Sequence, residues 1–547
     1  MNITTRNISA RIRTGVATGA LAWVLGFSAA HAATLDVTKA TIPEFQVAYA
    51  KGLTAERVTA AYLARVAAYE ETGPAINAII HMNPNALEQA KALDAERKAG
   101  KVRGPLHGIP IVLKDNFDTF DLPTTAGSQL LAGSIPNKDA FVTQKLRDAG
   151  VIIVAKVNMA EFANSGGKVP IGFSSGGLQT LNPHALDRSP GSSSGGTGSS
   201  IAAAFAVFGL GTDSQGSVRG PSHDNGIVGL KTTHGLVSKA GVIPLTLSLD
   251  TVGPMARNVT DIAVALNTMS GIDPNDRDTQ KSVGHGEDYT RYLKKDALKG
   301  VRIGIVRQFM GVDKEVDKVT EDSIAVLKAQ GAEIVDPVAY PDHLLGVRGP
   351  IWPFLEAVEF RKDVTDYLHT LKPGFPKDFD ELAAKANDPA THYRSPEKAA
   401  LFKSLVDRKM EYDDPIYVSL KTVMMPAFTN GVNSVFDKYG VTAMFFPTNN
   451  GPTGKIGPRP AEDDPNRPPQ PRTNNIGATS IASQSGLPEI VIPAGMSADG
   501  MPITVSFLGK AFADGQIIGM AYAFEQATHG IRTPKFTPSL KSDVVRY

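Results

Sequence analysis

Two loops rich in glycine and serine stand on either side of one short apolar segment. The first covers residues 188–196 and the second covers residues 211–219. Loops with small side chains let the backbone approach a ligand closely, and their hydroxyl and N–H groups can supply a nucleophile and donors for a developing oxyanion. Together the two loops indicate an acyl-transfer site.

A lysine follows the apolar run Ile109–Leu113, which has the pattern of a buried strand. Desolvation at the end of such a strand would lower the pKa of Lys114 and allow it to act as a base. The alternative is a lysine whose ammonium reaches water along the surface. Taken alone, the pattern favours that alternative.

Each serine loop also has two interpretations. Low-complexity Gly/Ser segments such as Ser192–Ser194 are often flexible turns. The small residues of Thr197–Phe208 predict a helix after this loop, and free N–H groups at its start would favour negative charge. In the second loop, a bend at Gly216 could aim several N–H groups at one oxygen beside the hydroxyl of Ser217.

The motifs Lys114-Asp115, Gly191-Ser192-Ser193-Ser194-Gly195-Gly196 and Gly211-Thr212-Asp213-x-x-Gly216-Ser217-Val218-Arg219-x-Pro221 occur in this order. In types and order they resemble the amidase signature family of serine hydrolases. The resemblance is dense over residues 42–270, resumes at 479–488 and 491–495, and is poor over 310–440.

The resemblance implies a Ser-cisSer-Lys triad: Ser217 as nucleophile, Ser193 as the bridging serine in a cis peptide, and Lys114 as base. It implies no metal and no other cofactor. The further residues that it implies are Ser214, Gln215, Gly216 and Ser217, whose N–H groups form the oxyanion hole, and Asp213, Arg219 and Ser194 in support. Gln215 stands where many members have glycine, as does Ser192 in the first loop, so the pocket shape near Gln215 is open.

Other motifs in the chain point to other hydrolases. The run Gly191–Gly195 satisfies G-x-S-x-G, but no histidine has the context that a nucleophile elbow needs. Ser165–Lys168 matches the S-x-x-K of penicillin-recognising enzymes, yet the chain has no Ser-Asp-Asn, and Lys231-Thr232-Thr233 is not Lys-Thr-Gly. The scattered acids of Asp273–Asp278 indicate a solvated loop more than a calcium site, because the ordered spacing of a calcium loop is missing.

Composition narrows the class of partner. The chain of 547 residues has 56 Lys and Arg against 55 Asp and Glu, and no block of basic residues, so nucleic acid is not an expected partner. A small-molecule or peptide amide is expected instead, and the oligomeric state stays open. With no cysteine in the sequence, disulfides and thiolate nucleophiles are excluded.

Residues 1–32 have the features of an export signal. Three arginines precede an apolar stretch over 15–30, and Ala30-His31-Ala32 fits an A-x-A cleavage site, which predicts cleavage after Ala32. The alternative is a membrane anchor, but the stretch is shorter than the roughly 20 residues that span a bilayer. We therefore expect a periplasmic or secreted protein, without a membrane association after cleavage, whose amidase domain covers residues 33–547.

Helix and strand patterns alternate along this domain and predict an α/β fold, with a central mixed sheet covered by helices on both faces. Thr54 is predicted to cap one helix, and a second is predicted over Asn85–Lys98. The aromatic, charged region at about 341–436 has helical patterns and could be either a cap over a pocket or an ordinary secondary core. A Pro-rich loop is predicted at about 451–475. Strands are expected at Ile109–Leu113, Val151–Ala155, Val301–Val306, Thr442–Phe446, Glu489–Pro493 and Ile503–Leu508.

These observations predict hydrolysis of a carboxylic amide C–N bond through an acyl-enzyme on Ser217, with ammonia or an amine released. A peptide amidase and an arylalkyl or aliphatic amidase are both compatible with the residues. The alternative is a non-catalytic periplasmic binding protein that keeps the fold. A transferase subunit that supplies ammonia to a tRNA-linked acyl group shares the motif, but it needs the cytoplasm, and the export signal argues against it.

Overall fold

The structure, a computed structural model, describes residues 33–164, 169–456 and 478–547. The predicted signal at 1–32, the Ser165–Lys168 motif and most of the predicted Pro-rich loop lie outside the described residues. In the described ranges, no helix combines the length and the apolar character that a membrane crossing requires.

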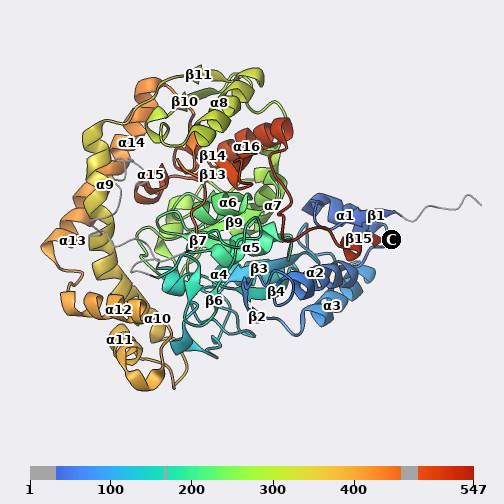
Figure 1. The fold of residues 1–547 in the computed structure, drawn as a ribbon, viewed down its shortest axis with the longest axis horizontal. Helices are drawn as coiled ribbons and strands as arrows, with labels where there is room; N and C mark the ends of the chain where they lie inside the picture. Colours follow the sequence, from blue (N-terminus) through green and yellow to red (C-terminus); the bar gives the residue numbers. More distant parts are fainter. Residues whose placement is uncertain (1–32, 165–168, 457–477) are drawn as a thin grey trace, which may run out of the picture. The chain divides into compact units, whose positions relative to one another are not determined.

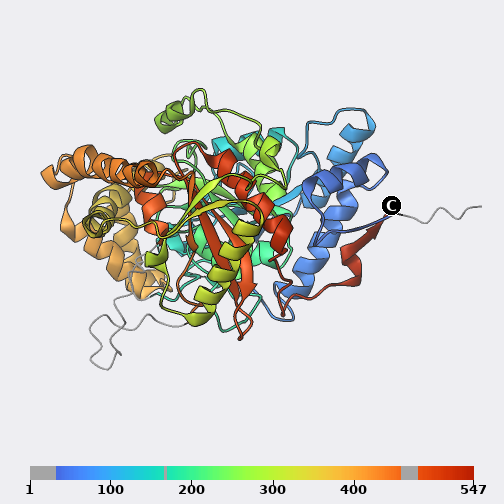
Figure 2. The same ribbon diagram turned by 90° about the horizontal axis from the view of Figure 1, so that it is seen from above.

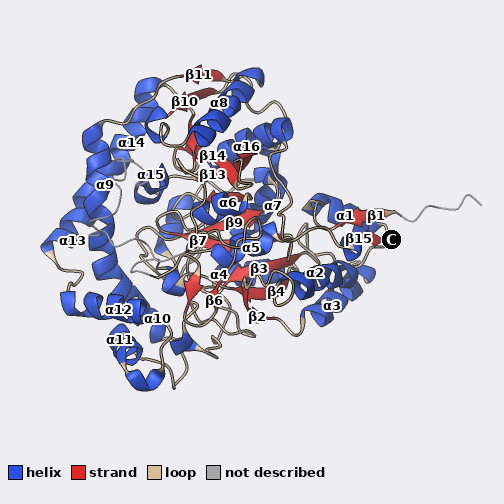
Figure 3. Ribbon diagram, viewed as in Figure 1, coloured by secondary structure: helices blue, strands red, loops and turns tan. Residues whose placement is uncertain are grey.

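A mixed sheet runs through the centre of the molecule (Figures 1 and 3). Neighbouring strands pair in parallel at β3–β4, β3–β7, β10–β11 and β10–β12, and antiparallel elsewhere in this sheet. Eleven strands of the described residues form it, in the order β11 (Glu333–Val335), β10 (Arg302–Ile305), β12 (Ala443–Pro447), β14 (Pro502–Gly509), β13 (Glu489–Met496), β8 (Val228–Lys231), β9 (Thr251–Ala256), β7 (Phe208–Asp213), β3 (Pro110–Lys114), β4 (Ile152–Val157) and β2 (Ile79–Met82).

Helices cover both faces of this sheet. On one face, α5 (Gly195–Ala202) packs on β3 and β7, and α6 (Arg219–Asn225) packs on β8 and β13. On the other face, α7 (Val259–Met269) packs on β8 and β9, and α16 (Asp514–Thr528) packs on β13 and β14. The predicted α/β class, with a mixed sheet between two layers of helices, is therefore confirmed.

Strand β3 shows how the sheet positions the predicted base. Successive side chains of a strand point to opposite faces. Ile111 and Leu113 lie in the core cluster that includes α7, whereas Val112 lies in the cluster that includes α5. Lys114, two residues after Val112, is therefore on the α5 face, where the first serine loop leads into α5.

The helix predicted over Thr197–Phe208 is wrong in its second half. Helix α5 ends at Ala202, Ala204 has a φ of 55°, and Phe208 begins β7. Strand β7 pairs with β3 and β9, which buries Phe208 and Leu210 in the main core. The pairing partners lie far away in sequence, so local residue type could not reveal them.

Both helices that the sequence predicts before its first predicted strand are present. Thr54 caps α2, since its hydroxyl accepts the Arg57 N–H at 3.2 Å. The predicted second helix is α3, one residue shorter at its start. The bounds of the remaining helices of this part are α1 (Ile42–Ala50), α2 (Ala55–Tyr69), α3 (Ala86–Lys98), α4 (Phe141–Asp148), α8 (Lys314–Ala329) and α15 (Ala478–Ser485). The short strands β1 (Thr34–Asp36) and β15 (Val544–Arg546) pair with each other, apart from the main sheet.

The region at 341–436 supplies a separate group of helices. Figures 1 and 2 show them gathered on one side of the central sheet, opposite α1–α3. Phe360, Phe379 and Phe402 are fully buried and contact one another, whereas Tyr412 and Tyr417 line a cavity. Both interpretations of the aromatic residues thus apply, each to a different part of the group. The elements are α9 (Asp342–Leu355), η6 (Glu356–Phe360), α10 (Arg361–Leu368), α11 (Phe379–Asn387), α12 (Pro396–Arg408), α13 (Pro415–Ser419), η8 (Leu420–Met424) and α14 (Met425–Tyr439).

Candidate active site

Lys114 ends β3 and is completely buried. Its Nζ lies 2.7 Å from Ser193 Oγ and 2.7 Å from Thr212 Oγ1. Burial lowers the pKa of Lys114 to about 7, although the nearby carboxylates of Asp250 and Asp213 act in the opposite direction. The interpretation as a surface lysine is therefore wrong. Close to neutral pH this amine can hold or release a proton.

Backbone hydrogen bonds and burial hold the first serine loop in place. The peptide bond between Ser192 and Ser193 is cis. The Ser193 carbonyl accepts the Ala160 N–H at 3.0 Å, and the Ser194 N–H donates to the Ser217 carbonyl at 3.2 Å. Ser193 and Ser194 are fully buried, so this loop is not a flexible surface turn. The Ser194–Ser217 contact also ties the two loops together.

Glycine is required where the first loop meets α6. Gly191 has a φ of 78°, and a Cβ at this position would lie 2.5 Å from Pro221 Cα. Gly211 on β7 meets a similar restriction, because its Cβ would lie 2.8 Å from Ser194 Oγ. The two glycines therefore let the serine loop lie directly against β7 and α6.

The second loop joins the end of β7 to α6 and carries Ser217. Among the three triad positions only Ser217 has measurable exposure, at 8%, and no described residue hydrogen-bonds its hydroxyl. The Gly216 N–H donates to Asp213 Oδ1 at 2.7 Å. The expectation for Gly216 therefore changes, because its N–H already has an acceptor. The N–H groups of Ser214, Gln215 and Ser217 remain as the candidate oxyanion donors.

An ion pair between Asp213 and Arg219 stabilises this loop. The Arg219 guanidinium donates to both oxygens of Asp213, at 3.0 and 2.9 Å, and both side chains are fully buried. Burial opposes the ionisation of Asp213, but the Arg219 charge outweighs it and holds the pKa of Asp213 far below its usual range. The Val218 N–H donates to the same carboxylate at 3.0 Å. The carboxylate thus fixes the backbone on either side of Ser217.

Arg219 also connects the loop to the C-terminal third of the chain. Its Nη1 donates to the Thr479 carbonyl at 2.7 Å and pairs with Glu489, and its Nη2 donates to Ser483 Oγ at 2.7 Å. Thr479 and Ser483 belong to α15, and Glu489 begins β13. The matching segment at 479–488 thus supplies two of the residues that hold Arg219 in place, and Glu489 directly follows it.

Three residues of the site were missed in the sequence. Thr212 contacts the Lys114 amine, and Asn116 contacts Thr212, since Asn116 Nδ2 donates to Thr212 Oγ1 at 3.2 Å. Asp250 accepts a hydrogen bond from Ser214 Oγ. Thr212 stands inside one of the motifs and Asn116 directly follows another, which is a usable signal. Asp250 has no such signal, because only the pairing of β7 with β9 brings it to the loop.

The competing motifs find no support in the described residues. His223 Nδ1 lies 2.8 Å from Thr504 Oγ1, and no described histidine contacts Ser193 or Ser217. Asp273 is buried and accepts from Ser238 Oγ at 2.6 Å, while Asp278 pairs with Lys239 at 2.7 Å. The interpretation of Asp273–Asp278 as a solvated loop is therefore wrong in part, since these acids have protein partners.

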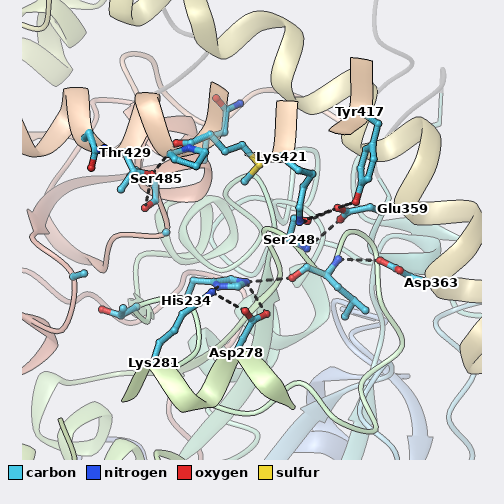
Figure 4. Close-up of a pocket in the computed structure, with 18 of the residues that line it drawn as sticks. His234, Ser248, Asp278, Lys281, Glu359, Asp363, Tyr417, Lys421, Thr429 and Ser485 are labelled. Carbon is cyan, nitrogen blue, oxygen red and sulfur yellow. Dashed lines mark hydrogen bonds and ion pairs between the residues drawn. The ribbon is translucent and has the colours of Figure 1, made fainter. Parts of the chain in front are cut away.

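A cavity of about 630 Å³ opens near the helical group (Figure 4). Its polar lining is internally paired: Asp278 contacts Lys281, and Glu359 contacts Lys421 and Tyr417. None of Lys114, Ser193 and Ser217 lines it. A second cavity, of about 10 Å³, lies between Asn116, Thr212 and Asp250, next to the lysine. Leu247 lines both cavities.

Comparison with known proteins agrees with this geometry. The family model described as Amidase matches residues 57–518. This chain belongs to the amidase signature family. It is an amidase signature hydrolase with the α/β fold of that family.

Two known proteins are similar to this chain over most of its length. The A subunit of glutamyl-tRNA(Gln) amidotransferase from Thermoanaerobacter pseudethanolicus is 35% identical over 487 residues, which cover 87% of this chain and 93% of that protein. A probable amidase of Arabidopsis thaliana is 30% identical over 516 residues, 92% of this chain and 93% of that protein. This chain is thus similar over most of its length both to a subunit of a transferase and to a probable amidase.

Among solved structures, native peptide amidase from Stenotrophomonas maltophilia superposes with a TM-score of 0.81 at 32% identity, covering 91% of this chain and 99% of that one. An amidase family protein from Bacillus anthracis gives a TM-score of 0.81 at 29% identity, with 91% and 93% covered. The amidase fold thus extends over nearly the whole described chain.

Proposed function

We propose that this amidase hydrolyses the C–N bond of a carboxylic amide through an acyl-enzyme on Ser217. The observation that carries the proposal is the buried contact of 2.7 Å between Lys114 Nζ and Ser193 Oγ, with Ser217 on the neighbouring loop that is tied to the Ser193 loop. A neutral amine in this position can accept a proton, so the reaction needs no histidine as base.

The reaction then follows from the arrangement. Ser217 Oγ passes its proton to Ser193 Oγ, which passes its own to Lys114 Nζ, and Ser217 Oγ attacks the amide carbon. The N–H groups of Ser214, Gln215 and Ser217 stabilise the oxyanion. The proton returns through Ser193 to the leaving nitrogen, the C–N bond breaks, and water hydrolyses the ester. The Ser217–Ser193 hydrogen bond is the contact that binding of substrate has to complete.

The relatives support an order in which substrate classes are tested. A peptide amide is the first substrate to test, because a peptide amidase superposes over nearly its full length. Arylalkyl and aliphatic amides are the next class. We further propose that the chain is exported and that its mature form begins at Ala33, since residues 1–32 have the charge and apolar pattern of a signal. Such a location is unsuited to a tRNA-dependent transferase.

The test combines turnover and labelling. A panel of peptide amides and small amides is assayed for released ammonia or amine with the wild-type chain and with Ser217→Ala. We expect Ser217→Ala to abolish both turnover and labelling by a fluorophosphonate, and the labelled peptide of the wild type to contain Ser217. Wild-type kcat/KM should fall about tenfold per pH unit below a pH of about 7, where Lys114 becomes protonated.

Two outcomes would contradict the proposal. Undiminished turnover by Ser217→Ala would remove Ser217 as nucleophile. Binding of amides without turnover of any, together with no labelling of Ser217, would favour the binding-protein alternative. The matched control is Ser434→Ala, because Ser434 is an exposed helical serine of α14 whose hydroxyl donates to the Asn430 carbonyl at 2.8 Å. We expect this control to keep both turnover and labelling.

A further inference from the structure

Asp250 is a buried carboxylate next to the candidate site. It lies directly before β9 and is 8% exposed. One oxygen accepts from Ser214 Oγ, and the other accepts from the N–H groups of Leu245 and Thr246 at 2.8 and 3.1 Å. Ser214 is the first residue of the segment Ser214–Ser217, the oxyanion loop, which carries the candidate oxyanion donors. Asp250 therefore joins that loop to the segment before β9 through side-chain contacts.

The same carboxylate faces the surroundings of Lys114. Asp250, Thr212 and Asn116 line the cavity of about 10 Å³, and Thr212 Oγ1 is in contact with Lys114 Nζ. Asn116 Oδ1 is buried in the same place without a hydrogen-bond partner among the described residues. A space of about this size accommodates one water molecule. One small chamber, lined mostly by apolar residues, thus lies between the acid and the hydroxyl partner of the base.

We propose that Asp250 is a positioning residue for amide hydrolysis, which holds the oxyanion loop through Ser214 and, by its negative charge, sets the pH at which Lys114 becomes neutral. This inference rests on the proposed function of Ser217 and Lys114. It assigns two effects to one side chain, and the two effects can be separated by substitution.

The other charged groups near this chamber have ion-pair or hydrogen-bond partners of their own. Asp213 also faces Lys114, but its charge is balanced by Arg219. Lys239 lines the chamber, while its ammonium donates to Asp278 at 2.7 Å and to the Leu247 carbonyl at 3.0 Å. Asp363 lies outside the lining of this chamber and accepts the Leu247 N–H. In the described part of the chain, Asp250 forms no contact ion pair with a lysine or arginine; its charge acts at longer range on Lys114, whose pKa it raises, and on Lys239.

The sign of the effect follows from these charges. Burial raises the pKa of Asp250 to about 6, so the carboxylate is mostly ionised where Lys114, with a pKa of about 7, titrates. An ionised neighbour stabilises the lysine cation and raises its pKa. Removing the charge should therefore lower the pKa of Lys114 and shift the loss of activity to lower pH.

The experiment compares Asp250→Asn with Ser214→Ala. We expect Asp250→Asn to shift the acid limb of kcat/KM by about 1 pH unit to lower pH, the size expected for one close opposite charge. Ser214→Ala loses the contact, so kcat should fall. The Ser214 hydroxyl also lowers the pKa of Asp250, so its loss should move the limb to lower pH by less than Asp250→Asn does. Asp261→Asn is the matched control, because Asp261 is also a buried acid that accepts a backbone N–H, from Ile42 at 2.7 Å. We expect this control to leave the limb in place.

Labelling keeps the test independent of the substrate. The rate at which a fluorophosphonate labels Ser217 also depends on neutral Lys114, so its pH profile should show the same shift in Asp250→Asn. Labelling without turnover of any amide would contradict the proposed function and still measure the role of Asp250. An unshifted limb in Asp250→Asn would overturn the inference. If that variant does not fold, Asp250→Glu keeps the charge and should retain the wild-type limb with a lower rate, and a limb shifted to lower pH would contradict the inference.

Discussion

At the scale of single residues, the chemistry depends on what surrounds the amine of Lys114. Two hydroxyls, of Ser193 and Thr212, lie 2.7 Å from it, and no carboxylate of the described residues forms an ion pair with it. Hydroxyl partners orient the amine without holding it in the charged form, whereas a contacting carboxylate would favour the cation. This is the physical reason why burial can bring the pKa of Lys114 to about 7.

Thr212→Val tests this orientation. Valine has nearly the same shape but removes one acceptor from the Lys114 amine, which keeps Ser193, and one from the Asn116 amide, which keeps the Ile243 carbonyl at 3.3 Å. The loss of a hydrogen bond typically costs about 0.5–1.5 kcal/mol, so we expect kcat/KM to fall about 2- to 12-fold. Steady-state kinetics on the best amide of the panel measures it. Thr212→Ser keeps the hydroxyl and should stay close to wild type. Equal activity of the valine and serine variants would contradict the role of the hydroxyl.

At the scale of elements, Arg219 holds four of them together. It lies at the start of α6, pairs with Asp213 at the end of β7, and reaches α15 and β13 through Thr479, Ser483 and Glu489. All of its charged partners are fully buried. The loop that carries Ser217 is therefore positioned by elements that are about 260–270 residues away in sequence.

Arg219→Met tests this connection. Removing one partner of a buried ion pair leaves uncompensated charge and typically costs about 3–5 kcal/mol, so we expect a large loss in the free energy of unfolding. Urea unfolding followed by circular dichroism measures it. Lys318→Met is the control, because Lys318 forms an exposed pair with Asp322 on α8, and such pairs contribute at most about 1 kcal/mol. Similar losses in the two variants would show that the buried network does not hold these elements.

At the scale of the whole molecule, the helical group at 341–436 is attached to the sheet through aromatic side chains. Phe162, just after β4, packs edge-on against Phe360 and Phe402, with ring centroids 6.3 and 5.8 Å apart. Phe402 also packs on Phe379, so one ring connects α12 with η6, α11 and the sheet region. This helical group is thus fixed to the rest of the molecule by a compact apolar cluster.

Phe402→Ala tests this attachment. A large-to-small change at a fully buried aromatic typically costs about 3–5 kcal/mol, and we expect the free energy of unfolding to fall by this amount. Chemical denaturation measures it. Phe120→Ala is the control, because Phe120 is 53% exposed and contacts Arg147 through a cation–π interaction worth no more than about 1 kcal/mol. A loss below about 1 kcal/mol in Phe402→Ala would contradict the attachment.

The sequence by itself determined the α/β class, the order of the motifs and six strands of the main sheet (β3, β4, β10, β12, β13 and β14), because hydrophobic periodicity and small-residue loops are local properties. It was wrong for the segment after α5, and it did not predict β8 and β9, whose glycines and proline interrupt the strand pattern. Only pairing with distant strands makes these segments extended.

Only the tertiary structure decided how the candidate site works. The lysine lies 79 residues from Ser193 and 98 from Thr212, and its pKa depends on desolvation and on charges such as Asp250 that no motif includes. It also decided that the Gly216 N–H is occupied by Asp213. Local sequence fixes which groups are available, whereas burial and distance, which set protonation and hydrogen bonding, arise only when distant segments pack together.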